Sequence, residues 1–192
     1  VFKENQMYTE IQTTKKGRQF TTERVNSLPE MAEMVRYNAI NQARKKLAPQ
    51  VQQDKLANLL ERHDFIEYFK HSLSHEIAQL FGTYNQHVQV VYLFDESINP
   101  DAETEDFLPQ IDLTIHLLLR VSSKSAALEM FTTSFERALT EVLRQMPSAA
   151  FAGYRSFLDV IPITERAIQE RRGYAVLLSS IYARPLEVWS RQ

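Results

Sequence analysis

The stretch from residue 88 to residue 121 decides the fold, and it reads VQVVYLF, DESINPDAETEDFLPQ and IDLTIHLLLRV in succession. In the last segment every second residue from Ile111 to Val121 is apolar, which is typical of a β-strand with one buried face. The first segment, residues 88–94, is apolar on one face and largely apolar on the other, which indicates a central strand. The stretch therefore predicts two strands joined by an acidic connection.

Amphipathic helices are predicted before and after these strands. Residues 28–47 begin with a capping serine and a proline and end with three cations, as helices do. A helix over residues 50–62 is expected to follow it. Residues 64–81 carry an apolar side chain at every fourth position, and Gly82 is expected to cap that helix at its C-terminus. Residues 125–146 have an apolar face broad enough to cover a sheet.

The C-terminal third is less regular. Residues 156–163 read as a third strand, in which Pro162 indicates an edge position or a strand end. Residues 164–182 continue as a helix with a weak point at Gly173, although the run from 174 to 182 could instead form a strand. Trp189 in an extended tail is expected to dock on the core.

These elements predict an α+β fold with a small, mainly antiparallel sheet covered by helices. Residues 1–27 are interpreted as an N-terminal arm, in which two threonine-rich runs flank a Lys-Lys-Gly-Arg turn and could pair as a hairpin. Residues 28–192 then form a single domain, helical over 28–82 and built around the sheet over 83–192. An isolated hairpin is marginal in water, so the arm is expected to lean on the domain or on another subunit.

The charge is unevenly distributed, although the net charge is only −2. Residues 71–119 contain no Lys or Arg, and their acidic residues are Glu76, Asp95, Glu96, Asp101, Glu103, Glu105, Asp106 and Asp112. Such a block repels a phosphate backbone, so a nucleic acid is not expected as a partner. A partner with a basic protein surface is expected instead. The chain also lacks cysteine, an apolar run of about 18 residues and a signal-peptide pattern, so a cytoplasmic protein that does not enter a membrane is expected.

The acidic connection is the predicted binding surface. Its six candidate residues are Asp95, Glu96, Asp101, Glu103, Glu105 and Asp106. They lack the glycine and ligand spacing of an EF-hand, so they are not interpreted as a calcium site. The alternatives are a solvated loop and a docking surface for a basic partner.

A histidine stripe offers the one metal-like pattern. His63, Glu67, His71 and His75 follow one another at four-residue steps, and two histidines at this spacing can share a zinc ion. The stripe lies about 160° around the helix from its apolar face, which directs it towards solvent. No metal or other cofactor is therefore expected, and the candidate ligands are kept as Glu67, His71 and His75.

The order helix, strand, strand, helix, strand resembles the minimal core of the nucleotidyltransferase superfamily. The resemblance implies a Gly-Ser pair after the first strand, two acids on the second strand and a third carboxylate on the next, which together hold two magnesium ions for nucleotidyl transfer. In this sequence Asp112 stands at the first acid position and Asp159 at the third. Thr114 replaces the second acid, and Asp95-Glu96 stands in place of Gly-Ser.

Two functions are therefore predicted. The preferred one is a non-enzymatic structural or assembly protein that contacts other subunits through its arm and its acidic connection. It rests on the small number of glycines, four in the chain, on the absence of phosphate-binding and nucleophile motifs, and on the segregated charge. The alternative is a nucleotidyltransferase-like enzyme, or a catalytically degenerate relative, that uses Asp112 and Asp159.

Overall fold

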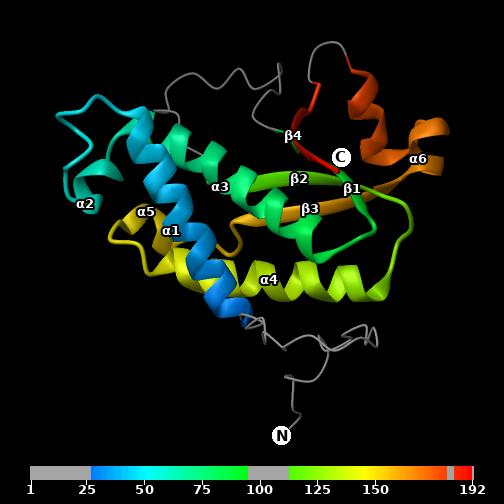
Figure 1. The fold of residues 1–192 in the computed structure, drawn as a ribbon, viewed down its shortest axis with the longest axis horizontal. Helices are drawn as coiled ribbons and strands as arrows, with labels where there is room; N and C mark the ends of the chain where they lie inside the picture. The colour runs from blue at the N-terminus through cyan, green and yellow to red at the C-terminus, as the bar shows by residue number, and fades with distance from the viewer. Residues whose placement is uncertain (1–26, 95–112, 181–183, 192) are drawn as a thin grey trace, which may run out of the picture.

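The computed structural model describes residues 27–94, 113–180 and 184–191. Nearly all of the predicted N-terminal arm, the acidic connection and Asp112 lie outside these residues. Figure 1 shows the described chain as one layered body with the C-terminal strand in its sheet. None of the described helices is long and apolar enough to cross a bilayer.

A four-stranded sheet lies at the centre, in the order β3-β2-β1-β4. Strand β1 (Val88–Phe94) pairs antiparallel with β2 (Ile115–Val121) and with β4 (Leu186–Ser190), while β3 (Leu158–Thr164) runs parallel to β2. The α+β class is confirmed, and the sheet is mixed rather than purely antiparallel. The parallel pair exists because the chain crosses over through a helix between β2 and β3, which returns it in the same direction.

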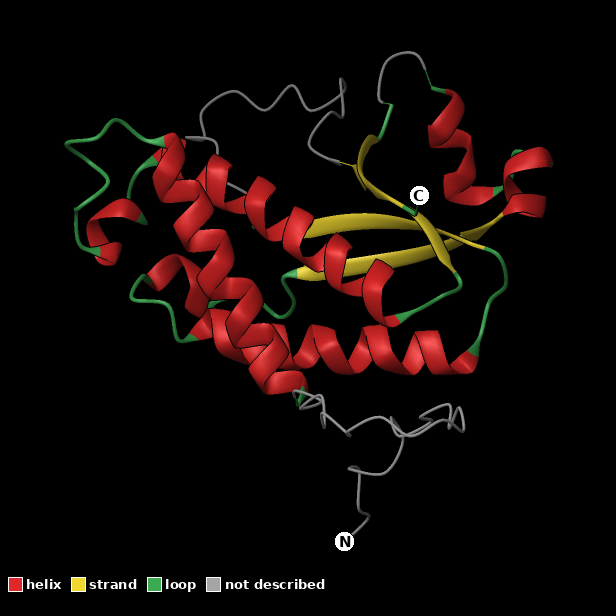
Figure 2. Ribbon diagram, in the orientation of Figure 1, coloured by secondary structure: helices red, strands yellow, loops and turns green. Residues whose placement is uncertain are grey.

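Three long helices cover one face of the sheet (Figure 1). They are α1 (Leu28–Lys46), α3 (His63–Tyr84) and α4 (Ala126–Arg144). Figure 2 shows α1 crossing in front of α3 and α4, which leaves these two next to the strands. The main core lies between the layers, and its largest fully buried side chains include Phe65, Phe69, Phe81 and Phe135.

The helix starts follow local capping chemistry. The Ser27 backbone N–H donates to Glu30 Oε2 at 2.9 Å and the Glu30 N–H donates to Ser27 Oγ at 3.5 Å, which completes a capping box at α1. Ser125 Oγ accepts from the Leu128 N–H at 3.1 Å at the start of α4. Both groups satisfy backbone donors that a first helical turn leaves free.

Two helix predictions were too long. The predicted helix over residues 50–62 is reduced to turns and a four-residue α2 (Leu56–Leu59), which has no side-chain cap. The predicted helix over residues 164–182 breaks into α6 (Glu165–Gln169) and a 3₁₀ segment, η2 (Gly173–Ser179). The break lies where Arg171 and Gly173 adopt φ of 50° and 54°, outside the helical region. Residues 174–179 are thus neither α-helix nor strand.

A second, smaller cluster lies on the other face of the sheet, which we call the outer face. Its buried members are Phe94, Leu118, Ile163 and Ala175. Because Ala175 belongs to η2, the segment from α6 to η2 covers part of this face. A further four-residue helix, α5 (Ala149–Ala152), adds the buried Phe151 to the main core instead.

The C-terminal strand is fastened to α3. The Trp189 ring lies so close to Gly82 that a β-carbon there would be 2.1 Å from Trp189 Cζ2. The Arg191 guanidinium donates from Nη2 to the carbonyls of Gly82 (2.7 Å) and Asn85 (3.0 Å), and from Nε to the carbonyl of Val88 (3.1 Å). Trp189 therefore docks on the core as predicted. Gly82 does not cap α3, which continues to Tyr84, and its lack of a side chain admits the indole ring.

Both edges of the sheet limit further pairing. The Ile115 N–H donates to the Phe157 carbonyl at 2.9 Å, so the even-numbered residues of β3 point their backbone groups away from β2. Among these, Leu158 donates its N–H to Ser156 Oγ at 3.2 Å, and Pro162 has no N–H. Strand β4 is five residues long and carries a bulge opposite Val91 and Tyr92. Short, bulged and proline-containing edges are the usual protection against unwanted strand addition.

Candidate functional site

A row of side chains crosses the outer face at one end of the sheet. The strand registers place Phe94 opposite His116 and His116 opposite Asp159. His116 Nδ1 lies 3.3 Å from Asp159 Oδ2, and the imidazole centroid lies 5.3 Å from that of the Phe94 ring. The His116 side chain is 12% exposed and that of Asp159 is 50% exposed, so a nearly buried imidazole is paired with a carboxylate that faces solvent.

The segment over the outer face borders this row. The Tyr174 ring of η2 lies 5.8 Å from the Phe94 ring. Arg120, four residues beyond His116 on β2, donates from Nη2 to Glu165 Oε2 at 2.6 Å and so connects β2 to the start of α6. Arg120 Nε is buried and has no hydrogen-bond partner among the described residues.

The His116–Asp159 pair is the arrangement on this face that is best suited to acid–base chemistry or metal binding. An imidazole that donates Nδ1–H to a carboxylate presents Nε2 as a lone-pair acceptor, the arrangement that general bases and metal ligands share. General base catalysis also needs a substrate proton within hydrogen-bond reach. In the part of the chain that the structure describes, Asp159 is the one side chain that hydrogen-bonds to His116, and no hydroxyl or amine does so.

The sequence candidates are only partly brought together. Asp159, the predicted third acid, lies on β3 and faces His116 across the parallel pair. Asp112 lies outside the described residues, so its distance from Asp159 is not defined, and the two-acid prediction stays a prediction. The six carboxylates predicted as a binding surface, Asp95, Glu96, Asp101, Glu103, Glu105 and Asp106, also lie outside the described residues.

The histidine stripe lies on the exposed side of α3, as its angular position predicts. His63, Glu67, His71 and His75 are all exposed. His75 Nδ1 lies 3.0 Å from the Val188 carbonyl oxygen of β4. The described residues contain no group of three or more His, Cys, Asp or Glu side chains that could hold a metal ion.

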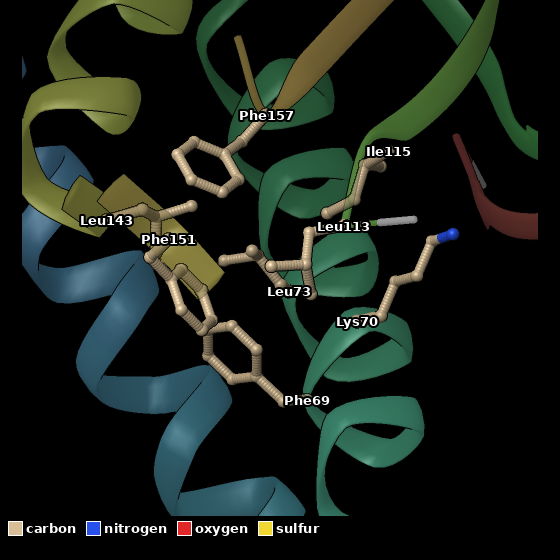
Figure 3. A pocket seen from close by; sticks show the side chains of 8 residues that line it. All are labelled: Phe69, Lys70, Leu73, Leu113, Ile115, Leu143, Phe151 and Phe157. Carbon is tan, nitrogen blue, oxygen red and sulfur yellow. The ribbon is translucent and has the colours of Figure 1, made fainter. Parts of the chain in front are cut away.

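A small pocket opens near the start of β2 (Figure 3). Its lining residues are Phe69, Lys70, Leu73, Leu113, Ile115, Leu143, Phe151 and Phe157. Its volume of about 10 Å³ has room for one water molecule at most. Figure 3 shows the Lys70 side chain extending away from the phenyl rings, so the pocket is an apolar packing gap.

The pKa shifts that the structure shows lie away from the outer face. At the start of α3 the Arg62 guanidinium donates to both carboxylate oxygens of Asp64, at 3.0 and 2.7 Å. This hydrogen bonding lowers the pKa of Asp64 and raises the pKa of Arg62. Both groups are exposed, so the pair orders a helix start rather than marking a reactive site.

The pairing of His116 with Asp159 was not predicted from the sequence, because a parallel register cannot be read from periodicity. The link between Arg120 and Glu165 was also missed, although Arg120 follows the same two-residue period as His116 and therefore belongs to the same face. The attachment of β4 by Arg191 could not be predicted from the neighbouring sequence, since the carbonyl acceptors of Arg191 belong to residues 82–88.

Comparison of the chain with protein-family models, with curated proteins and with solved structures finds no match.

Proposed function

We propose that the chain is a non-enzymatic structural or assembly protein that contacts other subunits through its acidic connection and its N-terminal arm. The observation that supports this most directly is the anchoring of the connection at both ends. Phe94, before it, is 7% exposed, and Leu113, after it, is 6% exposed. The Leu113 N–H also donates to Tyr154 Oη at 3.1 Å. The residues that flank the connection are therefore fixed on the packed sheet, and binding residues are often found on loops that a rigid scaffold positions.

The charge of the connection defines the kind of partner. Residues 95–112 contain acidic residues and no Lys or Arg. Their summed field attracts a basic surface and opposes phosphate groups. At physiological ionic strength this attraction acts over a Debye length of about 8 Å, so it favours direct docking and should weaken with added salt.

The N-terminal arm supplies positive charge, opposite to the negative charge of the connection. It contains the sequence Lys15-Lys16-Gly17-Arg18 between its two threonine-rich runs. A hairpin of this kind gains stability when it packs on a larger surface. An arm on one copy and an acidic connection on another are complementary in charge, which favours self-association.

The test is the mass of the particle in solution, measured by light scattering after size exclusion. We expect the full chain to form an oligomer that dissociates as salt is added. A chain lacking residues 1–26 keeps the Ser27 cap and should be monomeric. A chain with the six acids of the connection changed to Asn or Gln should be monomeric as well. A monomeric full chain at micromolar concentration would overturn the proposal for self-association.

A control separates loss of contact from loss of fold. The arm-deleted and charge-neutralised chains should keep the circular dichroism spectrum and the melting temperature of the full chain when that chain is compared as a monomer at high salt. A matched variant, Glu129→Gln with Glu141→Gln, removes exposed negative charge from α4 and should leave the particle mass unchanged. If it also dissociates the oligomer, general charge and not the connection drives association.

A nucleotidyltransferase-like enzyme, or a degenerate relative, is the second candidate. It is supported by the parallel pairing of β2 and β3, which lays Asp159 beside the strand that Asp112 precedes. This candidate expects magnesium-dependent binding of a nucleoside triphosphate that is lost in Asp112→Ala and in Asp159→Ala. Equilibrium dialysis with and without magnesium distinguishes the two, since the assembly protein should bind no nucleotide.

A further inference from the structure

We propose that His71 and His75 of α3 form a binding site for one divalent transition-metal ion, of the class of Zn²⁺ or Ni²⁺. The proposal does not depend on the assembly function. The two histidines are one helical turn apart, so their side chains lie on the same side of α3, with β-carbons about 5–6 Å apart. Both side chains are exposed, so an ion can reach them.

The hydrogen bond of His75 favours the ring tautomer that can bind a metal. Its Nδ1 lies 3.0 Å from the Val188 carbonyl oxygen, and a carbonyl oxygen can only accept. Nδ1 therefore carries the proton, and in the neutral ring Nε2 presents its lone pair away from β4. Metal-bound histidines typically donate their second ring nitrogen to a carbonyl or a carboxylate in this way.

The carbonyl that orients His75 is itself held in place. Val188 lies in the bulged part of β4, next to Trp189, whose ring packs against Gly82 of α3. Arg191 then donates to the carbonyls of Gly82 and Asn85 at the end of the same helix. Metal binding and docking of β4 should therefore reinforce each other, since each favours the same His75 ring form.

The ligand set also defines the ion. Imidazole nitrogens suit zinc, nickel and copper, whereas calcium and magnesium prefer oxygen ligands. Among the described residues no third ligand joins these two, so water can fill the remaining coordination positions. Such an open site exchanges its ion, unlike the four-ligand sites that hold structural zinc.

Titration calorimetry of the full chain with zinc chloride and with nickel chloride tests the site. We expect one ion per chain, and a loss of affinity of about tenfold or more in His71→Ala and in His75→Ala. His63→Ala is the matched control, because His63 is exposed on the same helix and should leave the affinity unchanged. Wild-type affinity in both His71→Ala and His75→Ala would overturn the proposal.

Two further measurements test the role of β4. A long-range ¹H–¹⁵N spectrum of the metal-free protein should show His75 protonated at Nδ1, and a ring protonated only at Nε2 would refute the orientation. Trp189→Ala, which loosens β4 without removing a ligand, should weaken zinc binding by about tenfold. Unchanged affinity in this variant, with its fold verified by circular dichroism, would show that β4 does not orient the site.

Discussion

Replacing Gly82 with alanine tests the fastening of the C-terminal strand. The new methyl carbon would lie 2.1 Å from Cζ2, 2.3 Å from Cη2 and 2.4 Å from Cε2 of Trp189. Real β-carbons essentially never approach other atoms this closely, and an indole ring is rigid. Either the ring moves out or β4 shifts away from α3.

The expected magnitude follows from two opposing effects. At an unobstructed position inside a helix, Gly→Ala stabilises by about 1 kcal/mol. Forcing an extra carbon into packed surroundings destabilises by about 1–3 kcal/mol, and more where a packed side chain is expelled. We therefore expect Gly82→Ala to lower the free energy of unfolding by about 1–2 kcal/mol.

The sign should reverse when the ring is absent. In a Trp189→Ala background the methyl group meets no indole, so Gly82→Ala should stabilise by about 1 kcal/mol. Urea unfolding followed by circular dichroism gives the four free energies of this double-mutant cycle. Trp189 is the only tryptophan in the chain, so its emission in the single variant Gly82→Ala should also shift to longer wavelength as the ring becomes exposed.

Gly153→Ala is the matched control, since a β-carbon at Gly153 meets nothing within 4 Å and its φ is −85°. It should change the stability by no more than about 0.5 kcal/mol. If Gly82→Ala leaves both the stability and the Trp189 emission unchanged, the packing of β4 on α3 is not as described.

Four further changes have expected outcomes. Ser27→Ala removes the α1 capping box and should lower the unfolding free energy by about 1 kcal/mol in urea melts, whereas Ser27→Asp should retain most of it. Arg191→Ala should destabilise by roughly 1–2 kcal/mol through the loss of its carbonyl contacts, and Arg191→Lys should restore only part of this; equal stability of all three proteins would contradict the contacts. The hydrogen bonds from Arg62 hold the pKa of the Asp64 carboxyl in the folded protein below its ordinary value of 3.8. The stabilisation from this pair is therefore full above that pH and is lost as the pH falls through the folded pKa. The stability difference between wild type and Asp64→Asn should accordingly shrink in acid melts below about pH 4, and a difference that grows there would contradict the pairing. Pro162→Val restores an outward N–H on β3 and should increase light scattering at high protein concentration, while a variant as soluble as wild type would argue against edge protection.

Local chemistry made the main elements predictable. The boundaries of α1 follow from Ser27, Pro29 and the terminal cations, and the four-residue apolar repeat of α3 is buried as expected, with Phe65 and Ile77 fully enclosed. The alternation in β2 likewise identified its buried face. In each of these cases the deciding groups lie within a few residues of one another.

Long-range partners account for what was not predicted. Gly82 reads as a helix cap because the sequence around it does not reveal Trp189, which occupies the space of its side chain. The parallel pairing of β3 with β2 depends on the path of α4 and not on the periodicity of either strand. The contact between His116 and Asp159 follows from that pairing and was equally hidden.

The candidate site was the least predictable part. Sequence alone suggested Asp112 and Asp159 as partners through a resemblance, whereas the residue opposite Asp159 in the described sheet is His116. The histidine stripe was placed on the solvent side of its helix by angular spacing. The bond from His75 to Val188 could not have been foreseen, because it joins two elements that are far apart in the chain.

The position of β4 in the sheet also orders events during synthesis. Val91 pairs with Trp189, so the sheet gains its fourth strand only after residues 186–190 have left the ribosome, well after β1 has done so. Until then β1 lacks a neighbour on one side, and Gly82 lacks the Trp189 ring that packs against it. A nascent chain that stalls before residue 186 therefore exposes the middle of its own sheet, the state in which chaperone binding would matter most.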